Sequence, residues 1–184
     1  AQRPLPDGWR RVKLGEVCTL NPRRPVIQRD DACPTSFIPM EAVDAGRGAV
    51  LAQRTRPYAE IKRGYTYFAN GDVLFAKITP CMQNGKHAVA QHLIDGFGFG
   101  TTEFHVIRPG EQLVPEWVWL FVRQPCVLTE AVNHFTGAVG QQRLPEDYLS
   151  SLEIPLPPPS PSSSELPRCS TSRWQPWRGR GRRR

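Results

Sequence analysis

A run of three prolines, Pro157-Pro158-Pro159, limits the part of this chain that can fold. Consecutive prolines lack the backbone donors of helices and sheets and favour an extended conformation, so we expect regular structure to end there. Beyond them Ser, Pro and Arg dominate, and Trp174 and Trp177 have no periodic apolar neighbours. The sequence therefore predicts one folded domain over residues 1–159 and a disordered tail over residues 160–184.

The basic character of the chain belongs mostly to this tail. The 184 residues carry a formal net charge of +7. Residues 160–184 supply +6 of it, with seven arginines against one glutamate, whereas residues 1–159 hold seventeen bases and sixteen acids and carry +1. Bulk charge therefore does not make the domain a nucleic-acid binder, and such a function has to rest on individual residues.

Cysteine usage and hydropathy indicate a cytoplasmic protein without a membrane role. The five cysteines are odd in number and show no C-x-x-C spacing, so reduced thiols are the simplest interpretation. We find no apolar run of about 18 residues and no signal peptide, and the first residues are polar.

Short apolar segments separated by turn signals predict a β-rich region before Pro115. The best hairpin signal is Asn70-Gly71-Asp72, which should join residues 61–68 to a strand at 73–78, because Asn-Gly tolerates the positive φ angles of tight hairpin turns. The glycine-rich residues 95–100 read as another turn signal. Further strands are expected at residues 35–40, 49–51, 87–94 and 103–107.

Helical periodicity begins at Pro115, which suits the first position of a helix. Trp117, Leu120 and Phe121 should form its buried face, and a second helix should begin after Pro125 and end near Gly137. An edge strand is expected at residues 152–155, since proline forbids a central one. The fold class is therefore α/β (α+β), with a twisted β-sheet, short helices and long loops.

Enzyme motifs are missing from the sequence. The glycines at 96, 98 and 100 lack the spacing of nucleotide-binding loops, and no acid stands two positions before Lys77 as in metal nucleases. Cys81 could be paired with His87 or His105, but nothing specifies that pairing, and an inert thiol is the commoner case. We therefore expect neither catalytic residues nor a bound metal.

Polar loops are the remaining candidates for function. Amide side chains can pair with adenine and basic ones with guanine or phosphate, and both kinds stand beside glycine in Gln83-Asn84-Gly85-Lys86 and in Gln141-Gln142-Arg143. Lys77 either reaches solvent or points at an anion. The arginines of residues 21–25 form either a solvated turn or a phosphate contact.

Several short motifs follow one another in a fixed order along residues 5–159. The motifs are Leu5-Pro6-Asp7-Gly8-Trp9, Val12-Lys13-Leu14-Gly15-Glu16-Val17, Phe37-Ile38-Pro39-Met40-Glu41, Gly64-Tyr65-Thr66-Tyr67-Phe68, Gly71-Asp72-Val73-Leu74-Phe75-Ala76-Lys77-Ile78-Thr79-Pro80-Cys81, Asn84-Gly85-Lys86, Gly100-Thr101-Thr102-Glu103-Phe104, Gly137-Ala138-Val139-Gly140-Gln141-Gln142-Arg143 and Ile154-Pro155-Leu156-Pro157-Pro158.

Over residues 5–159 these motifs resemble the target recognition domain of type I restriction-modification specificity subunits. The resemblance implies a non-catalytic module that reads one half of a split double-stranded DNA target. Its partners would be methyltransferase (modification) subunits and a translocating restriction subunit, to which S-adenosylmethionine, ATP and magnesium belong. Asp72, Gly85 and Glu103 are expected to be structural, and variable determinants are expected in residues 53–62. The DNA-facing residues it implies are Lys77, Thr79, Gln83, Asn84 and Lys86, with Thr101, Thr102, Gln141, Gln142 and Arg143 as second choices.

The chain departs from that family pattern after its prolines. A specificity subunit repeats the domain and separates the copies with long helices, whereas one copy is visible here. With suitable codons, a neighbouring reading frame of residues 159–171 spells an amphipathic helix start, so the tail is interpreted as a possible frameshift product. The alternatives left open are a structural remnant that folds without assembling and an enzyme with an unrecognised site, which fits least. Two half-subunits could also pair as a dimer.

Overall fold

Two four-stranded sheets form the centre of the computed structural model, which describes residues 4–138 and 142–158. The first has the order β2-β11-β8-β9 and is antiparallel throughout. The second has the order β6-β3-β10-β7, in which β3 and β10 are parallel. Their strands are β2 (Cys18–Leu20), β11 (Phe104–Pro109), β8 (Val73–Ala76), β9 (His87–Val89), β6 (Arg54–Pro57), β3 (Pro34–Ile38), β10 (Phe97–Gly100) and β7 (Thr66–Ala69).

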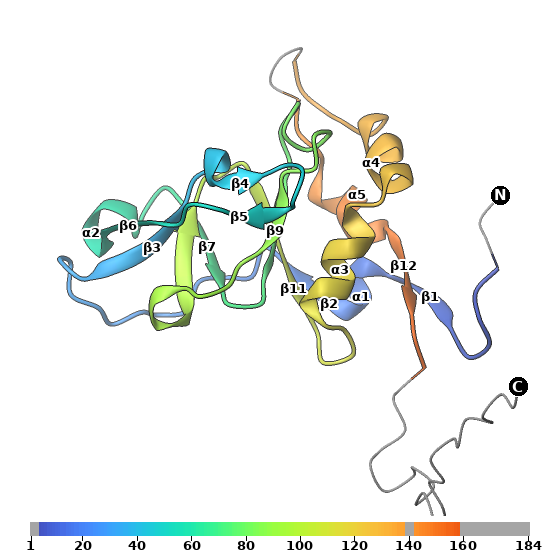
Figure 1. Cartoon of the computed structure of the whole chain (residues 1–184), viewed down its shortest axis with the longest axis horizontal. Coiled ribbons are helices and arrows are strands. Elements are labelled where there is room, and N and C mark those ends of the chain that lie inside the picture. Colours follow the sequence, from blue (N-terminus) through green and yellow to red (C-terminus); the bar gives the residue numbers. More distant parts are fainter. Residues whose placement is uncertain (1–3, 139–141, 159–184) are drawn as a thin grey trace, which may run out of the picture.

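Shorter elements complete the α+β fold (Figure 1). Two pairs of strands, β1 with β12 and β4 with β5, form separate two-stranded ribbons. They are β1 (Arg10–Lys13), β12 (Glu153–Leu156), β4 (Val43–Asp44) and β5 (Ala49–Val50). The helices are α1 (Leu14–Val17), α2 (Tyr58–Ile61), α3 (Pro115–Val122), α4 (Pro125–Val132) and α5 (Glu146–Ser151), with 3-10 turns η1 (Met40–Ala42) and η2 (Ile94–Gly96).

Strand β8 shows how the core is layered. All four of its side chains are buried, and successive side chains of a strand point to opposite faces. Val73 and Phe75 join the apolar cluster under α1, α3 and α5, whereas Leu74 and Ala76 join the cluster that lies between the two sheets. A third, smaller cluster packs α2 on the outer face of the second sheet. The two sheets are therefore sandwiched between helices.

The hairpin predicted at Asn70-Gly71 is wrong, although the turn itself exists. Strands β7 and β8 flank the turn but belong to different sheets, where β7 pairs with β10 and β8 with β9 and β11. Of Asn70 and Gly71, only Gly71 has a positive φ, at +87°, so the turn lacks the type I′ geometry that pairs neighbouring strands. The turn instead carries the chain from one sheet to the other.

The glycine-rich segment is mainly a strand rather than a turn. Residues Phe97–Gly100 form β10, an inner strand, and the turn is confined to η2 before it. A Cβ at Gly98 would lie 2.9 Å from the carbonyl oxygen of Ser36, and one at Gly100 would lie 2.5 Å from that of Ile38. These glycines therefore let β10 lie close to its parallel neighbour β3.

Both predicted helices form, with different details. Helix α3 buries Val118, Phe121 and Val122, whereas the predicted core residue Leu120 is 53% exposed. Val118, Phe121 and Val122 also have the i, i+3, i+4 spacing, so the periodicity alone could not predict which face of α3 is buried. Helix α4 ends at Val132 instead of near residue 137, and the six-residue α5 is too short to show a period.

At the end of the domain, β12 pairs with β1 in a two-stranded ribbon, which confirms the predicted edge strand. The predicted disordered tail, residues 160–184, lies outside the described residues. Within residues 4–138 and 142–158, helices are all too short or too polar to cross a bilayer.

Candidate nucleic-acid interface

Three of the predicted contact residues meet where β8 ends and β11 begins. The backbone N–H of Lys77 donates to the carbonyl of Glu103 at 2.9 Å, and that of Thr79 donates to the carbonyl of Gln142 at 3.4 Å. Leu144 donates to the carbonyl of Lys77 at 2.9 Å. In Figure 1 the loop after β8 and the segment that follows α4 project on the same side of the molecule. The fold therefore brings residues distant in sequence to one surface.

Arg143 is held at this surface by an ion pair. Its Nε and Nη2 atoms donate to the two carboxylate oxygens of Glu103 at 2.8 and 2.7 Å. The hydrogen bond from Arg143 is the main reason why the pKa of Glu103 lies below its ordinary value. The Arg143 side chain is still 44% exposed, so part of it is accessible to solvent while the ion pair fixes its orientation.

The loop of residues 78–86 is anchored from inside. Met82 is fully buried in the main core, and its backbone N–H donates to the carbonyl of Ile78 at 2.9 Å. Gly85 completes the loop with a φ of +77°, a conformation that favours glycine. Gln83 and Asn84 are exposed at the tip. Two amide side chains therefore stand on a loop whose base is packed.

Lys86, predicted to face DNA, makes contacts inside the protein. Its ammonium group donates to the carbonyl oxygens of Met40 at 3.1 Å and Val43 at 3.0 Å, and the residue is half-buried. These hydrogen bonds give Lys86 a structural role. Its contact with DNA stays a prediction.

The remaining predicted residues lie as follows. Thr101 accepts a hydrogen bond from the backbone of Glu103 at 3.2 Å and is half-buried, whereas Thr102 is exposed. Gln141 lies outside the described residues. The whole set of predicted contact residues stays a prediction.

The segment proposed for variable determinants contains edge strand β6 and helix α2. Arg54 pairs with Glu41 at 3.1 Å, and the guanidinium of Arg56 lies 4.5 Å from the ring centroid of Phe37. Its arginines are thus partly engaged within the domain. In the nearby basic turn, Arg24 donates to the carbonyl of Lys62.

Sequence reasoning missed Arg123, one residue after α3. Its guanidinium donates to carbonyls of two separate loops, among them Ala45 at 3.0 Å and Gly85. Burial lowers the pKa of Arg123 below its ordinary value. No local motif marks such a residue, because its partners lie about 40 to 80 positions earlier in the chain.

A buried histidine near this surface, His87, has a structural role. His87 is fully buried, its Nδ1 accepts from the backbone of Ala76 at 3.1 Å, and its Nε2 donates to the carbonyl of Met82 at 3.2 Å. Burial lowers the pKa of His87 to about 3. Because both ring nitrogens are engaged and the ring is neutral, His87 is unsuited to activate the Cys81 thiol.

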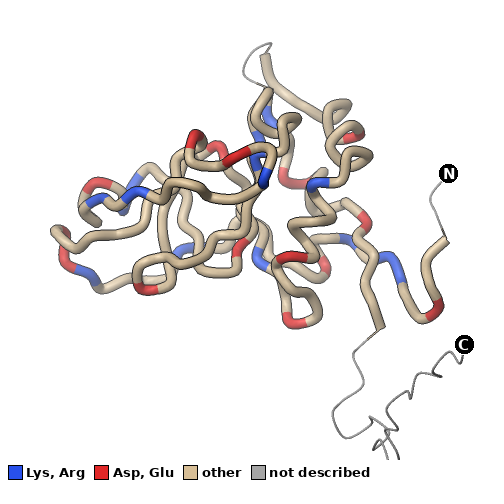
Figure 2. Tube along the Cα trace, viewed as in Figure 1, with Lys and Arg blue, Asp and Glu red and all other residues tan. Residues whose placement is uncertain are grey.

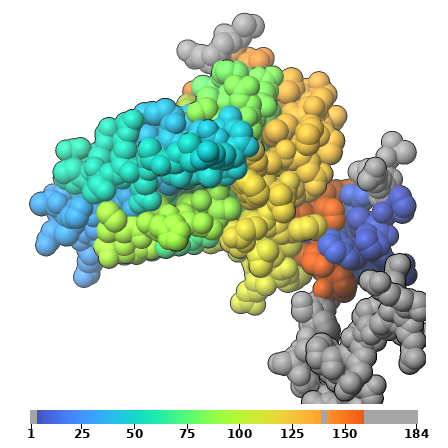
Figure 3. All heavy atoms as spheres, viewed as in Figure 1, coloured from blue at the N-terminus to red at the C-terminus, as the bar shows by residue number. Residues whose placement is uncertain are grey.

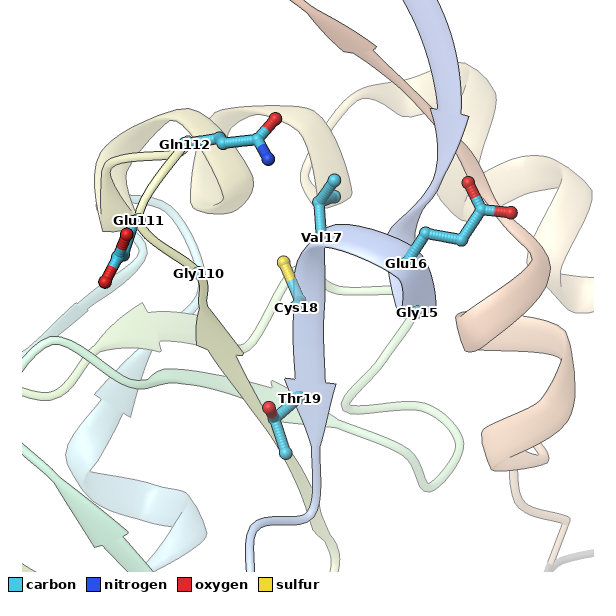
Figure 4. Close-up of a pocket in the computed structure, with 8 residues that line it drawn as sticks. All are labelled: Gly15, Glu16, Val17, Cys18, Thr19, Gly110, Glu111 and Gln112. Carbon is cyan, nitrogen blue, oxygen red and sulfur yellow. The ribbon is translucent and has the colours of Figure 1, made fainter.

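A hollow of about 390 Å³ lies at the opposite end of β11 (Figure 4). Burial raises the pKa of Cys18, which lines it, to about 11, so this thiol is protonated and unreactive at neutral pH. Gln112 lines the same hollow, away from the candidate interface. Among the described residues, no group of three His, Cys, Asp or Glu side chains could hold a metal ion.

Charge is mixed over the domain. Figure 2 shows basic and acidic positions interspersed along the trace, without a broad basic face in this view. Any anion contact therefore depends on a few placed side chains.

In the space-filling view the loop after β8 lies against α3 and α4 as one continuous surface (Figure 3).

Comparison with known proteins identifies relatives of the whole domain. The specificity subunits of the type I restriction enzymes EcoEI and EcoAI from Escherichia coli are 38% and 37% identical to this chain over 155 residues. Those residues are 84% of this chain but only 26% of each relative. The chain therefore spans about a quarter of the length of these relatives.

Solved structures agree on the fold. The HsdS subunit from Thermoanaerobacter tengcongensis matches with a TM-score of 0.64 and 24% identity, over 85% of this chain and 39% of that one. A chain from work on complex assembly and conformational transition of the type I R-M system matches with a TM-score of 0.67 and 24% identity, over 85% of this chain and 40% of that chain. The family described as type I restriction modification DNA specificity domain matches residues 6–161. The chain therefore belongs to the family of type I restriction-modification DNA specificity domains.

Proposed function

We propose that this domain recognises a short double-stranded DNA sequence, one half of a bipartite target, through the loops that meet where β8 ends and β11 begins. The single observation that carries the proposal is the loop of residues 78–86, which is packed at its base by Met82 and presents Gln83 and Asn84 to solvent. Amide side chains on a fixed backbone suit bidentate pairing with adenine in the major groove.

The neighbouring side chains fit the same role. Arg143 is oriented by Glu103, so its guanidinium is placed before any ligand arrives. A fixed arginine can pair with guanine N7 and O6 or hold a phosphate. Lys77 and Thr79 lie beside it, where backbone hydrogen bonds join the two loops. A nearly neutral domain can thus bind DNA through a few residues, with the backbone positioned by phosphate contacts and the sequence read by base contacts.

The domain itself would carry out no chemical step. It would position type I methyltransferase subunits and a restriction subunit on DNA, and S-adenosylmethionine, ATP and magnesium would be bound by those partners. The domain would then work in the cytoplasm, where its DNA target is. These partner assignments rest on family membership.

Selection from a random duplex library tests the proposal. The full chain is immobilised, and bound duplexes are amplified through several rounds and sequenced. We expect enrichment of one short motif at moderate salt. Libraries that stay random, while the protein remains folded by circular dichroism, would contradict sequence-specific recognition.

A matched pair of variants locates the contact. Gln83→Ala removes an exposed amide at the proposed interface, and Gln112→Ala removes one at the opposite end of β11. We expect Gln83→Ala to weaken binding to the selected duplex by about 1–3 kcal/mol if it pairs with a base, and Gln112→Ala to leave it unchanged. Equal effects of the two variants would place the interface elsewhere.

A further inference from the structure

The turn between β4 and β5 is fixed to the loop of residues 78–86 by a side chain from a third element. Arg123 donates to the carbonyl oxygens of Ala45 at 3.0 Å and Gly46 at 3.2 Å, which belong to the turn. The same guanidinium donates to the carbonyls of Gly85 and His87, the latter at 3.4 Å. One charged group therefore bridges two segments that do not share a sheet.

Two further side chains reinforce this bridge. Trp119 donates through Nε1 to the carbonyl of Gly48 at 3.0 Å and to that of His87 at 3.1 Å. Lys86 donates to carbonyls of η1 and β4 at 3.1 and 3.0 Å. Strands β4 and β5 have two residues each, and an isolated two-stranded hairpin of that size is not stable in water. The position of the turn is therefore set by these contacts.

Arg47 stands at the tip of this turn. Its backbone N–H donates to the carboxylate of Asp44 at 2.6 Å, and the N–H of Gly48 donates to the carbonyl of Asp44 at 2.9 Å, so the backbone on both sides is fixed. The Arg47 side chain is exposed, and no ion pair within residues 4–138 and 142–158 involves it. An arginine in this position has its charge available for an external anion.

The turn also lies close to the loop. A Cβ added to Gly85 would come to 3.6 Å from the carbonyl oxygen of Ala45, so the space between the two backbones is about one methyl group wide. Gln83 and Asn84 are at most two residues from Gly85 and are exposed. A duplex that contacts this tip would carry its phosphates within reach of an arginine side chain on the turn.

We propose that the β4–β5 turn is a second DNA-contacting arm beside the loop of residues 78–86, in which Arg47 binds a backbone phosphate and Arg123 positions the arm. This inference rests on the proposed function. Arg47 supplies affinity and register rather than sequence discrimination, and Arg123 acts through the placement of the turn.

The first test measures the affinity of the full chain for the selected duplex and for a scrambled duplex over a salt series. Arg47→Gln is compared with Arg10→Gln, an exposed arginine of β1. We expect Arg47→Gln to weaken binding to both duplexes about five- to tenfold and to reduce the slope of log K against log salt by about 1, as for one lost phosphate contact. Arg10→Gln should change neither.

The second test separates positioning from general stability. Arg123→Gln should weaken binding by a similar factor, and adding Arg47→Gln to it should cost little more, because the arm is already displaced. Independent, multiplicative losses would contradict the positioning role of Arg123. Thermal unfolding of each variant shows whether it still folds. This readout is independent of the non-additive effect of the two substitutions on DNA affinity.

A photocrosslinking amino acid at position 47 gives a direct readout that does not depend on Arg123. It should crosslink to the selected duplex, whereas the same group at position 10 should not. If the unmodified chain binds no duplex, the proposed function fails. If the chain binds a selected duplex but position 47 behaves like position 10 in affinity, salt slope and crosslinking, the second arm is refuted and the proposed function stands.

Discussion

The carboxylate of Asp72 holds the turn where the chain crosses between the two sheets, so its replacement should destabilise the domain. Its Oδ1 accepts from Arg108 Nε at 2.7 Å, and its Oδ2 accepts from Arg108 Nη2 at 2.7 Å and from the backbone of Ala69 at 2.8 Å. The Asp72 side chain is 1% exposed and that of Arg108 is 37% exposed. Asp72 thus ties the turn after β7 to β11 and fixes the start of β8.

The substitution Asp72→Asn keeps the shape of the side chain but removes its charge. It replaces one carboxylate oxygen by an NH₂ group, which points N–H bonds at the donors that the oxygen had accepted from. Removing one partner of a buried ion pair costs about 3–5 kcal/mol. Because the Arg108 guanidinium reaches solvent, we expect a smaller loss of about 2–3 kcal/mol in the free energy of unfolding. For a domain of this size that corresponds to a fall in melting temperature of roughly 5–10 °C.

Urea unfolding followed by circular dichroism measures the loss. The control is Asp31→Asn, which breaks the exposed ion pair of Asp31 with Lys62 and should cost less than about 1 kcal/mol. Equal losses in Asp72→Asn and Asp31→Asn would show that the buried carboxylate does not hold the crossing between the sheets.

Three further predictions concern the site and the core. The pKa of His87 falls from 6.5 to about 3 on folding. As the pH is lowered, His87 is therefore protonated in the unfolded chain before it is protonated in the folded one. The free energy of unfolding should keep its full value above pH 6.5. It should fall below that pH by up to about 1.4 kcal/mol per pH unit, less steeply in His87→Gln, as urea titrations at several pH values would show. Arg143→Ala should raise the pKa of Glu103 toward its ordinary value, a shift that carbon NMR titration detects, and an unchanged pKa would contradict the ion pair. Gly100→Ala places a Cβ 2.5 Å from the β3 backbone and should destabilise the domain by roughly 1–3 kcal/mol. The control is Gly46→Ala, for which the nearest atom is 3.5 Å from the added Cβ and a smaller loss is expected. Similar melting temperatures of the two variants would contradict the close approach of β10 and β3.

Local chemistry in the sequence predicted the features that depend on neighbouring residues. Pro115 and Pro125 begin helices α3 and α4, and residues 153–156 form an edge strand that contains Pro155. Strand pairing could not be predicted in this way. The Asn70-Gly71 turn depends on neighbouring residues, whereas the pairing of β7 and β8 depends on which faces of the two sheets are buried.

The candidate site was predictable only in part for the same reason. Polar loop residues such as Gln83 are visible in the sequence because glycine and amides cluster there. The role of Arg123 depends on carbonyl groups of distant loops, and no spacing rule points to them. Lys86 shows the converse, since its type suggests an anion contact while its ammonium group binds backbone carbonyls.

If the loop of residues 78–86 reads the DNA sequence, its exposed amide side chains must discriminate between duplexes. The most direct measurement is the ratio of dissociation constants for the scrambled and the selected duplex, in the unmodified chain and in the variant with Gln83→Ala and Asn84→Ala. We expect the ratio to fall by about tenfold or more in the double variant, because base contacts are lost while phosphate contacts remain. An unchanged ratio in a folded double variant would contradict sequence reading by this loop.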